Sequence, residues 1–188
     1  MVAFHEDSER LLRMINDLLD LARLESGQTP QRFEIISPAI LIKSAVPDLT
    51  PLLEANGARL VTDISAELPD VAVDLRQIGH VLSNLVANAA RHSRPGEDVV
   101  LSAKPIDKSV RFSVLDHGPG IPKEFQPRIF ERFFRVPGTE NSTGVGLGLA
   151  IAKEMIVSHG GRIGLQSTSS YGSEFYFDLP ATNNGVKA

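Results

Sequence analysis

The first element that the hydrophobic pattern predicts is a long amphipathic helix between Glu6 and Glu25. Its apolar residues, most of them leucine, recur at helical spacing opposite arginine, asparagine and aspartate. Gly27 and Pro30 predict where it ends. The apolar stripe is wider than the seam of a two-helix coiled coil, so we expect it to pack against several helices, as in a bundle. The remaining chain offers no adjacent antiparallel helix, which indicates a partner chain or a missing half.

A second helix is predicted between Ser37 and Gly57. Ser37 followed by Pro38 is typical of an N-cap and a first helical position, and Gly57 is typical of a stop. Pro47 and Pro51 lie inside this segment. Because proline lacks an amide hydrogen and clashes with the preceding turn, we expect them to kink or break the helix.

Alternating apolar residues predict a sheet in the rest of the chain. We expect extended segments at residues 32–36, 58–65, 71–73, 99–104, 110–115, 162–167 and 173–179. Asp74 is predicted to cap a long helix that runs to about Arg91, and a further helix is expected over residues 147–159. The two middle strands should form a hairpin that turns at Asp107 and Lys108.

Residues 118–143, rich in glycine, proline and phenylalanine, lack a clear period. They predict a long mobile loop with one short helix near residues 125–130. Runs of strands interleaved with helices, mostly linked by hairpins, favour the α+β class. We therefore predict a two-layer α/β sandwich with an N-terminal amphipathic helix.

Composition limits the possible partners. A chain of 188 residues with 42% hydrophobic residues can bury one ordinary core. The formal charge of -4 leaves no positive excess for a phosphate backbone, which argues against nucleic acid as a partner. No apolar run reaches the ~18 residues that cross a bilayer, so we expect no membrane contact by this chain. The absence of cysteine excludes a disulfide framework, a thiolate nucleophile and a cysteine-based zinc site.

The segment NLVANAARHS, residues 84–93, brings four polar residues onto one face of the helix expected after Asp74. They are Asn84, Asn88, Arg91 and His92, which lie three or four positions apart. Asparagine is a mediocre helix former and needs a hydrogen-bond partner when it is buried. This face is therefore either a polar functional site or an ordinary solvated surface.

The segment VLDHGPGIP, residues 114–122, places a carboxylate at the end of an apolar strand, with two glycines after it. Asp116, Gly118 and Gly120 can form an ordinary tight turn. Alternatively, Asp116 accepts a hydrogen bond from the exocyclic amine of adenine, and the glycines let a planar ligand approach the backbone. Guanine presents a carbonyl at that place, and two acceptors cannot pair.

The segment STGVGLGLAIAKEMIVSHGG, residues 142–161, places Gly144, Gly146 and Gly148 before an amphipathic helix. Free amides at a helix N-terminus bind phosphate, and glycines allow a close approach. The segment does not match a dinucleotide fingerprint, because no strand precedes it and the spacing differs. It also lacks the Gly-Lys-Ser/Thr of a P-loop.

In this order, the three segments resemble the N, G1 and G2 boxes of the ATP-binding domain of sensor histidine kinases, within the gyrase, Hsp90, histidine kinase and MutL (GHKL) group. IFERFFR, residues 129–135, resembles the F box, and YGSEFYFDLP, residues 171–180, resembles the motif of the last strand. RLLRMINDLLDLARLESG, residues 10–27, resembles the second helix of the dimerisation and phosphotransfer hairpin. The resemblance implies the Bergerat ATP-binding fold, in three regions. These are part of the hairpin over residues 1–30, the ATP-binding catalytic domain over 31–183 and a tail over 184–188.

The resemblance implies ATP and Mg²⁺ as the bound species. Asn88 would coordinate the magnesium ion that bridges the phosphates, since one amide oxygen together with phosphates and waters suits its octahedral preference. Asn84 would support the same polar face and Arg91 would add positive charge, which makes these three the catalytic candidates. His92 would contact a phosphate or the ribose, or be a simple helix-end histidine.

The resemblance also implies an adenine pocket. Asp116 would read the base, with Gly118, Gly120 and Ile121 beside it. Ser173 would complete this pocket, or it would be a plain strand serine.

A lid over the nucleotide is implied as well. Its hinges and backbone amides would come from Thr143, Gly144, Val145, Gly146, Leu147, Gly148 and Leu149. Phe130, Phe133 and Phe134 would hold the lid and meet the phosphotransfer helices, or they would only anchor the loop. Arg135 would reach the γ-phosphate, or it would be solvated.

One position separates the branches of this group. Hydrolysing members commonly carry a water-activating glutamate four residues before the magnesium asparagine, where this chain has Asn84, and an amide cannot act as a general base. We therefore expect transfer of the γ-phosphoryl group to a protein histidine of a homodimeric intact protein, and relay to the receiver domain of a response regulator. The alternatives are a GHKL-type ATPase, a serine-directed anti-sigma kinase, or a nucleotide-binding module that is inactive on its own.

His5, in the segment FHEDSERLL, is the first candidate for the phosphorylated histidine. Only His5 and Glu6 match the family's acceptor box, and the helix after them resembles the second helix of the hairpin rather than the first. We therefore interpret His5 as a solvated residue near a helix start, and expect no autophosphorylation of this chain alone. The resemblance implies a cytoplasmic domain of a parent protein that is anchored in the inner membrane.

Overall fold

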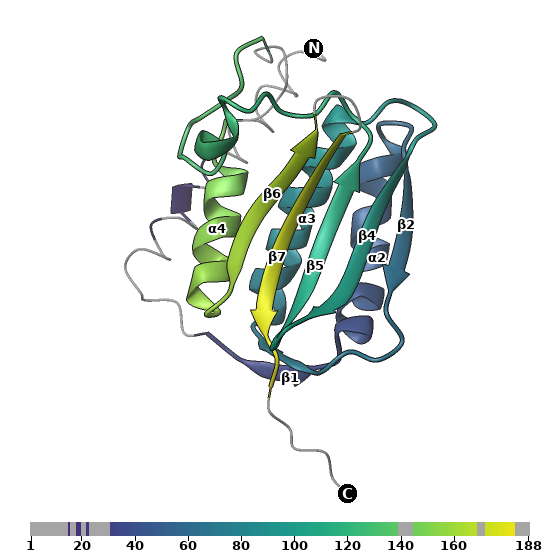
Figure 1. Cartoon of the computed structure of the whole chain (residues 1–188), viewed down its shortest axis with the longest axis vertical. Helices are drawn as coiled ribbons and strands as arrows, with labels where there is room; N and C mark the ends of the chain where they lie inside the picture. The colour runs from purple at the N-terminus through teal and green to yellow at the C-terminus, as the bar shows by residue number, and fades with distance from the viewer. Residues whose placement is uncertain are drawn as a thin grey trace, which may run out of the picture.

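The protein consists of a mixed sheet with helices packed against one of its faces (Figure 1). The computed structural model describes residues 31–138, 145–168 and 172–182. It also describes four isolated residues, Ile15, Leu18, Leu19 and Ala22.

The main sheet has five strands in the order β2-β4-β5-β7-β6. They are β2 (Arg59–Ile64), β4 (Asp98–Ile106), β5 (Ser109–Asp116), β6 (Arg162–Thr168) and β7 (Gly172–Pro180). The pair β2 and β4 is parallel, and every other neighbouring pair is antiparallel. A separate two-stranded sheet pairs β1 (Glu34–Ile36) with β3 (Val71–Val73).

Three helices cover one face of the main sheet: α2 (Pro38–Glu54), α3 (Leu75–His92) and α4 (Gly148–Ser158). The middle helix, α3, packs against both α2 and α4. The chain leaves β5 as a loop whose described part, residues 117–138, contains one turn of 3₁₀ helix, Gln126–Arg128. This arrangement confirms the predicted α+β sandwich of two layers.

The core lies between the sheet and the three helices. Phe112 on β5 stacks on Phe177 on β7, with ring centroids 5.0 Å apart and ring planes 10° apart, and both side chains are fully buried. Leu82 and Leu85 on α3 are also fully buried. Large aromatic and aliphatic side chains contribute most of the hydrophobic stabilisation of such a core.

The other face of the sheet is polar and is organised around Asp178 on β7, which is only 3% exposed. Arg111 donates two hydrogen bonds to its carboxylate, at 2.7 and 2.9 Å, and Arg162 donates a third at 2.6 Å. The Arg111 guanidinium also lies over the ring of Tyr176, 3.8 Å from its centroid. Burial would raise the pKa of Asp178, but the two arginines bring it below its ordinary value. The ionised carboxylate therefore links three neighbouring strands.

Two local predictions are confirmed. Asp74 is the N-cap of α3, and its Oδ1 accepts hydrogen bonds from the amides of Arg76 at 3.1 Å and Gln77 at 3.2 Å. The hairpin between β4 and β5 turns where expected, and Asp107 there has a φ of 48°. This left-handed conformation is one that aspartate tolerates better than most residues.

The expectations for α2 need correction. We predicted that Pro47 and Pro51 would kink or break the helix. The predicted break is wrong, because α2 continues through both prolines, and a kink stays a prediction. Both prolines are exposed, so the carbonyl groups that lose a partner can bond to water, while Leu49 and Leu53 hold the opposite side in the core. Ser37 occupies the predicted N-cap position, but its side chain makes no capping hydrogen bond.

The first predicted helix lies mostly outside the described residues. Ile15, Leu18, Leu19 and Ala22 are helical, and their side chains are exposed. The packing of this helix against partner helices stays a prediction, as does the interpretation of His5. Within the described part of the chain, no helix has the length and apolar character needed to cross a membrane.

Phe112→Ala should lower the free energy of unfolding by about 3–5 kcal/mol. It leaves a cavity beside Phe177 that cannot collapse easily, because the core is enclosed by the sheet and the three helices. Val61→Ala, on edge strand β2 and 40% exposed, is the control and should cost less than about 1 kcal/mol. Chemical unfolding followed by circular dichroism measures both. Equal losses in the two variants would contradict the assignment of Phe112 to the core.

Candidate functional site

The polar face predicted on α3 lies on the half of the helix that ends beside β5. Asn84, Asn88 and His92 are partly buried, and Arg91 is exposed. Asn84 Nδ2 is a buried donor that has no hydrogen-bond partner in the described part of the chain. Because an unpaired buried donor is destabilising, an acceptor from outside the chain would be favoured at this atom.

His92 and Arg91 differ in charge although they are neighbours. Burial lowers the pKa of His92 below its ordinary value, and the charge of Arg91 lowers it further. The imidazole is therefore neutral near neutral pH, and it can accept or donate a hydrogen bond. The permanent positive charge at this end of α3 is that of Arg91.

Asp116 ends β5 and is only 2% exposed. Its Oδ1 accepts hydrogen bonds from two backbone amides, those of Gly118 at 2.9 Å and Ser173 at 3.2 Å. Ser173 lies opposite Asp116 in the pairing of β5 with β7, so the sheet register fixes this contact. Oδ2 makes no hydrogen bond to any described residue. Burial raises the pKa of Asp116 above its ordinary value, and the two amide hydrogen bonds limit the rise.

Two glycines let the backbone close around Asp116. A Cβ on Gly118 would lie 2.6 Å from the carbonyl oxygen of His92, so the loop after β5 touches the end of α3. Gly172 has a φ of 98°, and a Cβ there would collide with the backbone carbonyl of Asp116. The approach of a ligand to Gly118 and Gly120 stays a prediction. Gly172 was not singled out from the sequence, where its signal was a glycine at the start of a strand pattern.

The N-terminus of α4 lies against the polar face of α3. A Cβ on Gly148, the first residue of α4, would lie 3.2 Å from Asn84 Oδ1. The hydrogen bond from Ile151 N to Leu147 O is the first of the helix, so the amides of residues 148–150 have no partner within it. Leu147 is 1% exposed and anchors this end in the core. Unpaired amides and the helix dipole both favour an anion here.

Gly146 connects α4 to the phenylalanine-rich loop. Its φ is 81°, its carbonyl accepts a hydrogen bond from Phe133 N at 2.9 Å, and a Cβ would lie 2.7 Å from Phe134 O. The Phe133 side chain is 58% exposed. Thr143 and Gly144 lie outside the described residues, and the hinge role of this region stays a prediction.

The other two phenylalanines predicted for the lid, Phe130 and Phe134, are packed. Phe130 meets the ring of Phe175 edge-on at 6.4 Å, and Phe134 meets the ring of Phe125 at 6.2 Å. The Arg128 guanidinium lies 4.4 Å from the Phe134 centroid, within the range of a cation–π contact. These contacts are of the kind expected if the phenylalanines anchor the loop. Contact of the same residues with the phosphotransfer helices stays a prediction.

The remaining predicted residues surround this arrangement. Ile121, Val145 and Leu149 are partly buried and pack against the core, and Arg135 is partly buried. The described residues contain no cluster of three His, Cys, Asp or Glu side chains that could hold a metal ion. The amide oxygen of Asn88, predicted from the sequence as the ligand to Mg²⁺, suits that ion together with oxygens of the nucleotide.

A groove of about 470 Å³ lies between α2 and α3, away from these residues. Its lining includes Asp48, Arg76 and His80 and none of the predicted site residues. The candidate site is defined by contacts instead: the loop after β5 and the start of β7 meet at Asp116, that loop touches the end of α3 at His92, and the start of α4 lies against Asn84.

A family model described as histidine kinase-, DNA gyrase B-, and HSP90-like ATPase matches residues 73–183. The matched region contains α3, β5, α4 and β7, which supply the candidate site. The chain belongs to this family. Within the family, its motifs and its relatives define it as the ATP-binding catalytic domain of a sensor histidine kinase.

Among curated proteins, the chain is 39% identical over 177 residues to the alginate biosynthesis sensor protein KinB of Pseudomonas aeruginosa, which covers 93% of this chain and 29% of that protein. It is 32% identical over 184 residues to the sensor histidine kinase WalK of Bacillus subtilis, covering 96% of this chain and 30% of that protein. The chain thus spans less than a third of the length of these relatives.

Solved structures share the fold. Full-length ShkA in complex with AMPPNP superposes with a TM-score of 0.84 at 32% identity, over 98% of this chain and 39% of that one. The histidine kinase AdeS of Acinetobacter baumannii superposes with a TM-score of 0.74 at 25% identity, over 94% of this chain and 81% of that one. The predicted fold class is therefore confirmed by both architecture and comparison.

Gly118→Ala should lower the free energy of unfolding by about 1–3 kcal/mol, because the new Cβ would press on a backbone oxygen that cannot rotate away. Gly79→Ala is the matched control: it lies in α3 with nothing within 4 Å of the added carbon, and should stabilise by about 0.5–1 kcal/mol. Thermal unfolding measures both variants. A Gly118→Ala protein as stable as the wild type would contradict the close approach of this loop to α3.

Proposed function

We propose that the intact protein uses this domain to transfer the γ-phosphoryl group of ATP to one of its own histidines. The arrangement at Asp116 is the observation that carries the proposal. From that histidine the phosphoryl group would pass to the receiver domain of a response regulator. The N-terminal helix, with its wide apolar stripe, would belong to the hairpin through which the intact protein dimerises.

Asp116 is suited to read the adenine of ATP. The two backbone amides on Oδ1 fix the orientation of the carboxylate and leave Oδ2 for a donor from outside the chain. At 2% exposure, water competes poorly for this acceptor. An acceptor here favours the exocyclic amine of adenine and rejects the carbonyl of guanine.

The elements beside Asp116 can bind phosphates. Asn84 Nδ2 has no partner among the described residues, the amides of residues 148–150 have none within α4, and Arg91 adds positive charge at the end of α3. Asn88 shares the polar face of α3 with Asn84 and Arg91, and its amide oxygen would hold Mg²⁺. When bound, magnesium neutralises charge on the phosphate oxygens and helps to orient the γ-phosphoryl group.

The chemistry of Asn84 favours phosphoryl transfer over hydrolysis. An amide cannot remove a proton from water near neutral pH, so Asn84 can position a phosphate but cannot activate a water molecule. Phosphoryl transfer depends mainly on positioning and on charge stabilisation, which amide donors, an arginine and a magnesium ion supply. A histidine on the hairpin of the intact protein would be the nucleophile.

Asp116→Asn should weaken AMPPNP binding about tenfold or more and reduce the preference for AMPPNP over GMPPNP. The asparagine Oδ1 can still accept both backbone amides, so the fold should persist, but Nδ2 would present a donor to the adenine amine. Calorimetric titration measures both affinities. Asp63→Asn, an exposed carboxylate on β2, is the control and should match the wild type. A folded Asp116→Asn protein with unchanged AMPPNP affinity would refute the adenine site.

Asn88→Ala should remove the magnesium dependence of AMPPNP binding, because it removes the amide oxygen that we propose as the protein's ligand to Mg²⁺. The measurement is AMPPNP affinity with Mg²⁺ and with EDTA. Asn56→Ala, which removes an exposed amide at the end of α2, is the matched control. If Asn88→Ala keeps the wild-type response to Mg²⁺, Asn88 is not the ligand.

A further inference from the structure

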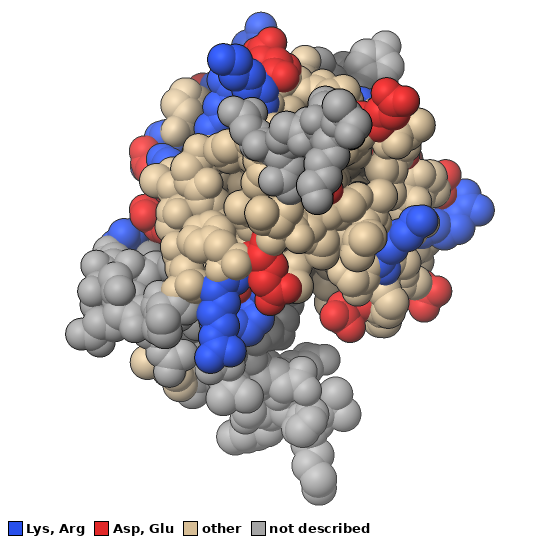
Figure 2. Space-filling view, turned by 90° about the horizontal axis from the view of Figure 1, so that it is seen from below, with Lys and Arg blue, Asp and Glu red and all other residues tan. Residues whose placement is uncertain are grey.

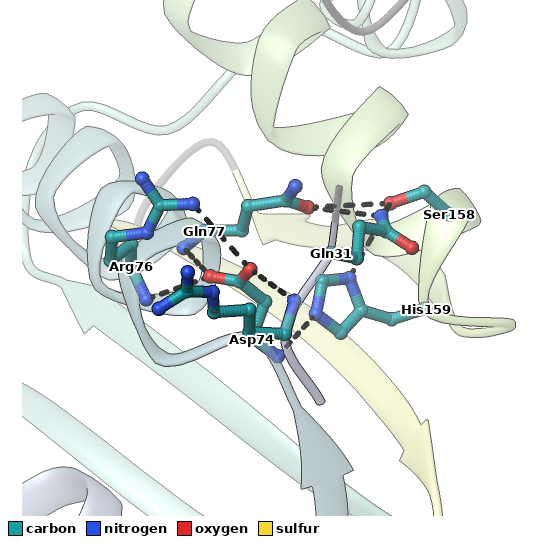
Figure 3. A network of polar contacts seen from close by, with 7 residues as sticks. Gln31, Asp74, Arg76, Gln77, Ser158 and His159 are labelled. Atoms are coloured by element: carbon teal, nitrogen blue, oxygen red, sulfur yellow. Dashed lines mark hydrogen bonds and ion pairs between the residues drawn. The ribbon is translucent and has the colours of Figure 1, made fainter. Parts of the chain in front are cut away.

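A second polar cluster lies at the opposite end of α3 from Asp116 (Figure 3). The amide of Asp74 donates to His159 Nε2 at 3.0 Å, and His159 Nδ1 lies 2.7 Å from the carbonyl oxygen of Met155. Together these contacts require a neutral imidazole with its hydrogen on Nδ1. Burial lowers the pKa of His159, which is consistent with that form. The histidine therefore joins the start of α3 to the end of α4.

Residues 31–33, which we call the strap, close over this junction. The amide of Arg32 donates to Asp74 Oδ2 at 3.0 Å, while Oδ1 of the same carboxylate caps α3. The ring of Phe33 lies 5.0 Å from the ring of His159, tilted by 60°. One aspartate thus holds both the first turn of α3 and the strap.

The strap also contacts α4. Gln31 Nε2 donates to Ser158 Oγ at 2.8 Å and lies 3.3 Å from Gln77 Oε1. Figure 3 shows the Gln31 side chain beside the last turn of α4, facing Gln77 on α3. These hydrogen bonds bridge the two helices through a third segment of the chain.

The two helices meet again at the candidate nucleotide site. They run antiparallel, since the start of α3 lies at the end of α4 and Asn84 lies against Gly148 at the start of α4. About 15 Å of helix separates Asp74 from Asn84, at about 1.5 Å per residue. A change in the angle between α3 and α4 at the strap therefore also changes the contact of Asn84 with the first turn of α4.

We propose that the strap couples the N-terminal helix to the nucleotide site. Docked, it holds α3 and α4 in the relative position that the nucleotide requires; released, it weakens nucleotide binding. The proposal rests on the proposed function, since it assigns a regulatory input to the same site. The strap follows the predicted N-terminal helix in the chain, so a displacement of that helix reaches Gln31 before it reaches the sheet or the other helices.

The contacts of the strap are of a kind that can be released. Gln31 is partly exposed, Arg32 is exposed and Phe33 is 47% exposed. The hydrogen bonds of Gln31 join neutral groups near the surface and contribute modestly to stability, whereas the bond from the Arg32 amide to the buried carboxylate of Asp74 contributes more. Figure 2 views the molecule from below, the end that carries β1, and acidic and basic side chains are interspersed there around uncharged surface. Docking of the strap therefore depends on a few specific contacts and not on electrostatic attraction by a large surface of one charge.

The test compares Arg32→Pro with Arg32→Ala in the whole 188-residue chain. Proline removes the amide hydrogen that binds Asp74, whereas alanine removes only the exposed side chain and keeps the backbone hydrogen bond. We expect Arg32→Pro to weaken AMPPNP binding about fivefold. It should also shift the NMR resonances of the Gly148 amide and the Asn84 side-chain amide in the nucleotide-free protein. Arg32→Ala should change none of these.

Gln31→Glu is the second variant. If Arg32→Pro does not fold, this variant tests whether docking of the strap affects the nucleotide site. A carboxylate of the same shape cannot donate to Ser158 or Gln77, so it should weaken the docking of the strap and shift the same measurements in the same direction. In the wild type, AMPPNP should slow hydrogen exchange of the Arg32 amide, because coupling between two binding events is reciprocal.

The proposal is overturned if the resonances of Phe33 and His159 show a released strap while those of Asn84 and Gly148, and the AMPPNP affinity, stay at wild-type values. Failure of the wild type to bind AMPPNP would refute the proposed function instead. In that case the Asn84 and Gly148 resonances decide the coupling: a shift on strap release supports it, and unchanged resonances refute it.

Discussion

The packing of α3 between the sheet and its two neighbouring helices is the constraint on which the rest of the structure depends. Most of its apolar side chains are buried against the sheet and the neighbouring helices, while Asn84 and Asn88 lie on an adjoining face. One helix can serve both purposes because residues three and four positions apart share a face. The hydrophobic burial that stabilises the domain therefore also fixes the direction of the polar side chains of the site.

The sheet and its adjoining loop hold the carboxylate of Asp116 in one orientation. Strand register brings Ser173 opposite Asp116, and two backbone amides hold one carboxylate oxygen. Gly118 and Gly172 make this possible because larger residues would collide with His92 or with Asp116 itself. The orientation of this carboxylate is thus a property of the backbone, which would reduce the reorganisation needed in the binding role that we propose for it.

Local features of this structure could be predicted from the sequence, and long-range contacts could not. The cap of α3 by Asp74 and the turn at Asp107 depend on residues close in sequence, so the pattern alone predicted them. The contact of Asp74 with His159 joins positions 85 residues apart, which no local pattern contains. The same is true of the parallel pairing of β2 with β4.

The candidate site likewise has features that the sequence predicts and contacts that it does not predict. Motif order pointed to Asp116 and Asn88, but the reason for each glycine depends on atoms from distant segments, such as the carbonyl of His92 beside Gly118. The mistaken expectation of a helix break at Pro47 and Pro51 has a similar origin. Whether proline interrupts a helix depends on which side faces water, and that is known only once the helix is packed.

The binding of Arg111 and Arg162 to Asp178, on the outer face of the sheet, has a consequence for association between molecules. Among the described strands, β6 is an edge strand that pairs only with β7, and such an edge can accept a strand from another chain. Arg162 lies on this edge and is tied to a buried carboxylate, so its charged side chain is held at the border of the sheet. An approaching strand would have to desolvate or displace that charge. The two ion pairs of Asp178, which join three strands inside one molecule, thus also protect the sheet against edge-to-edge pairing with other molecules.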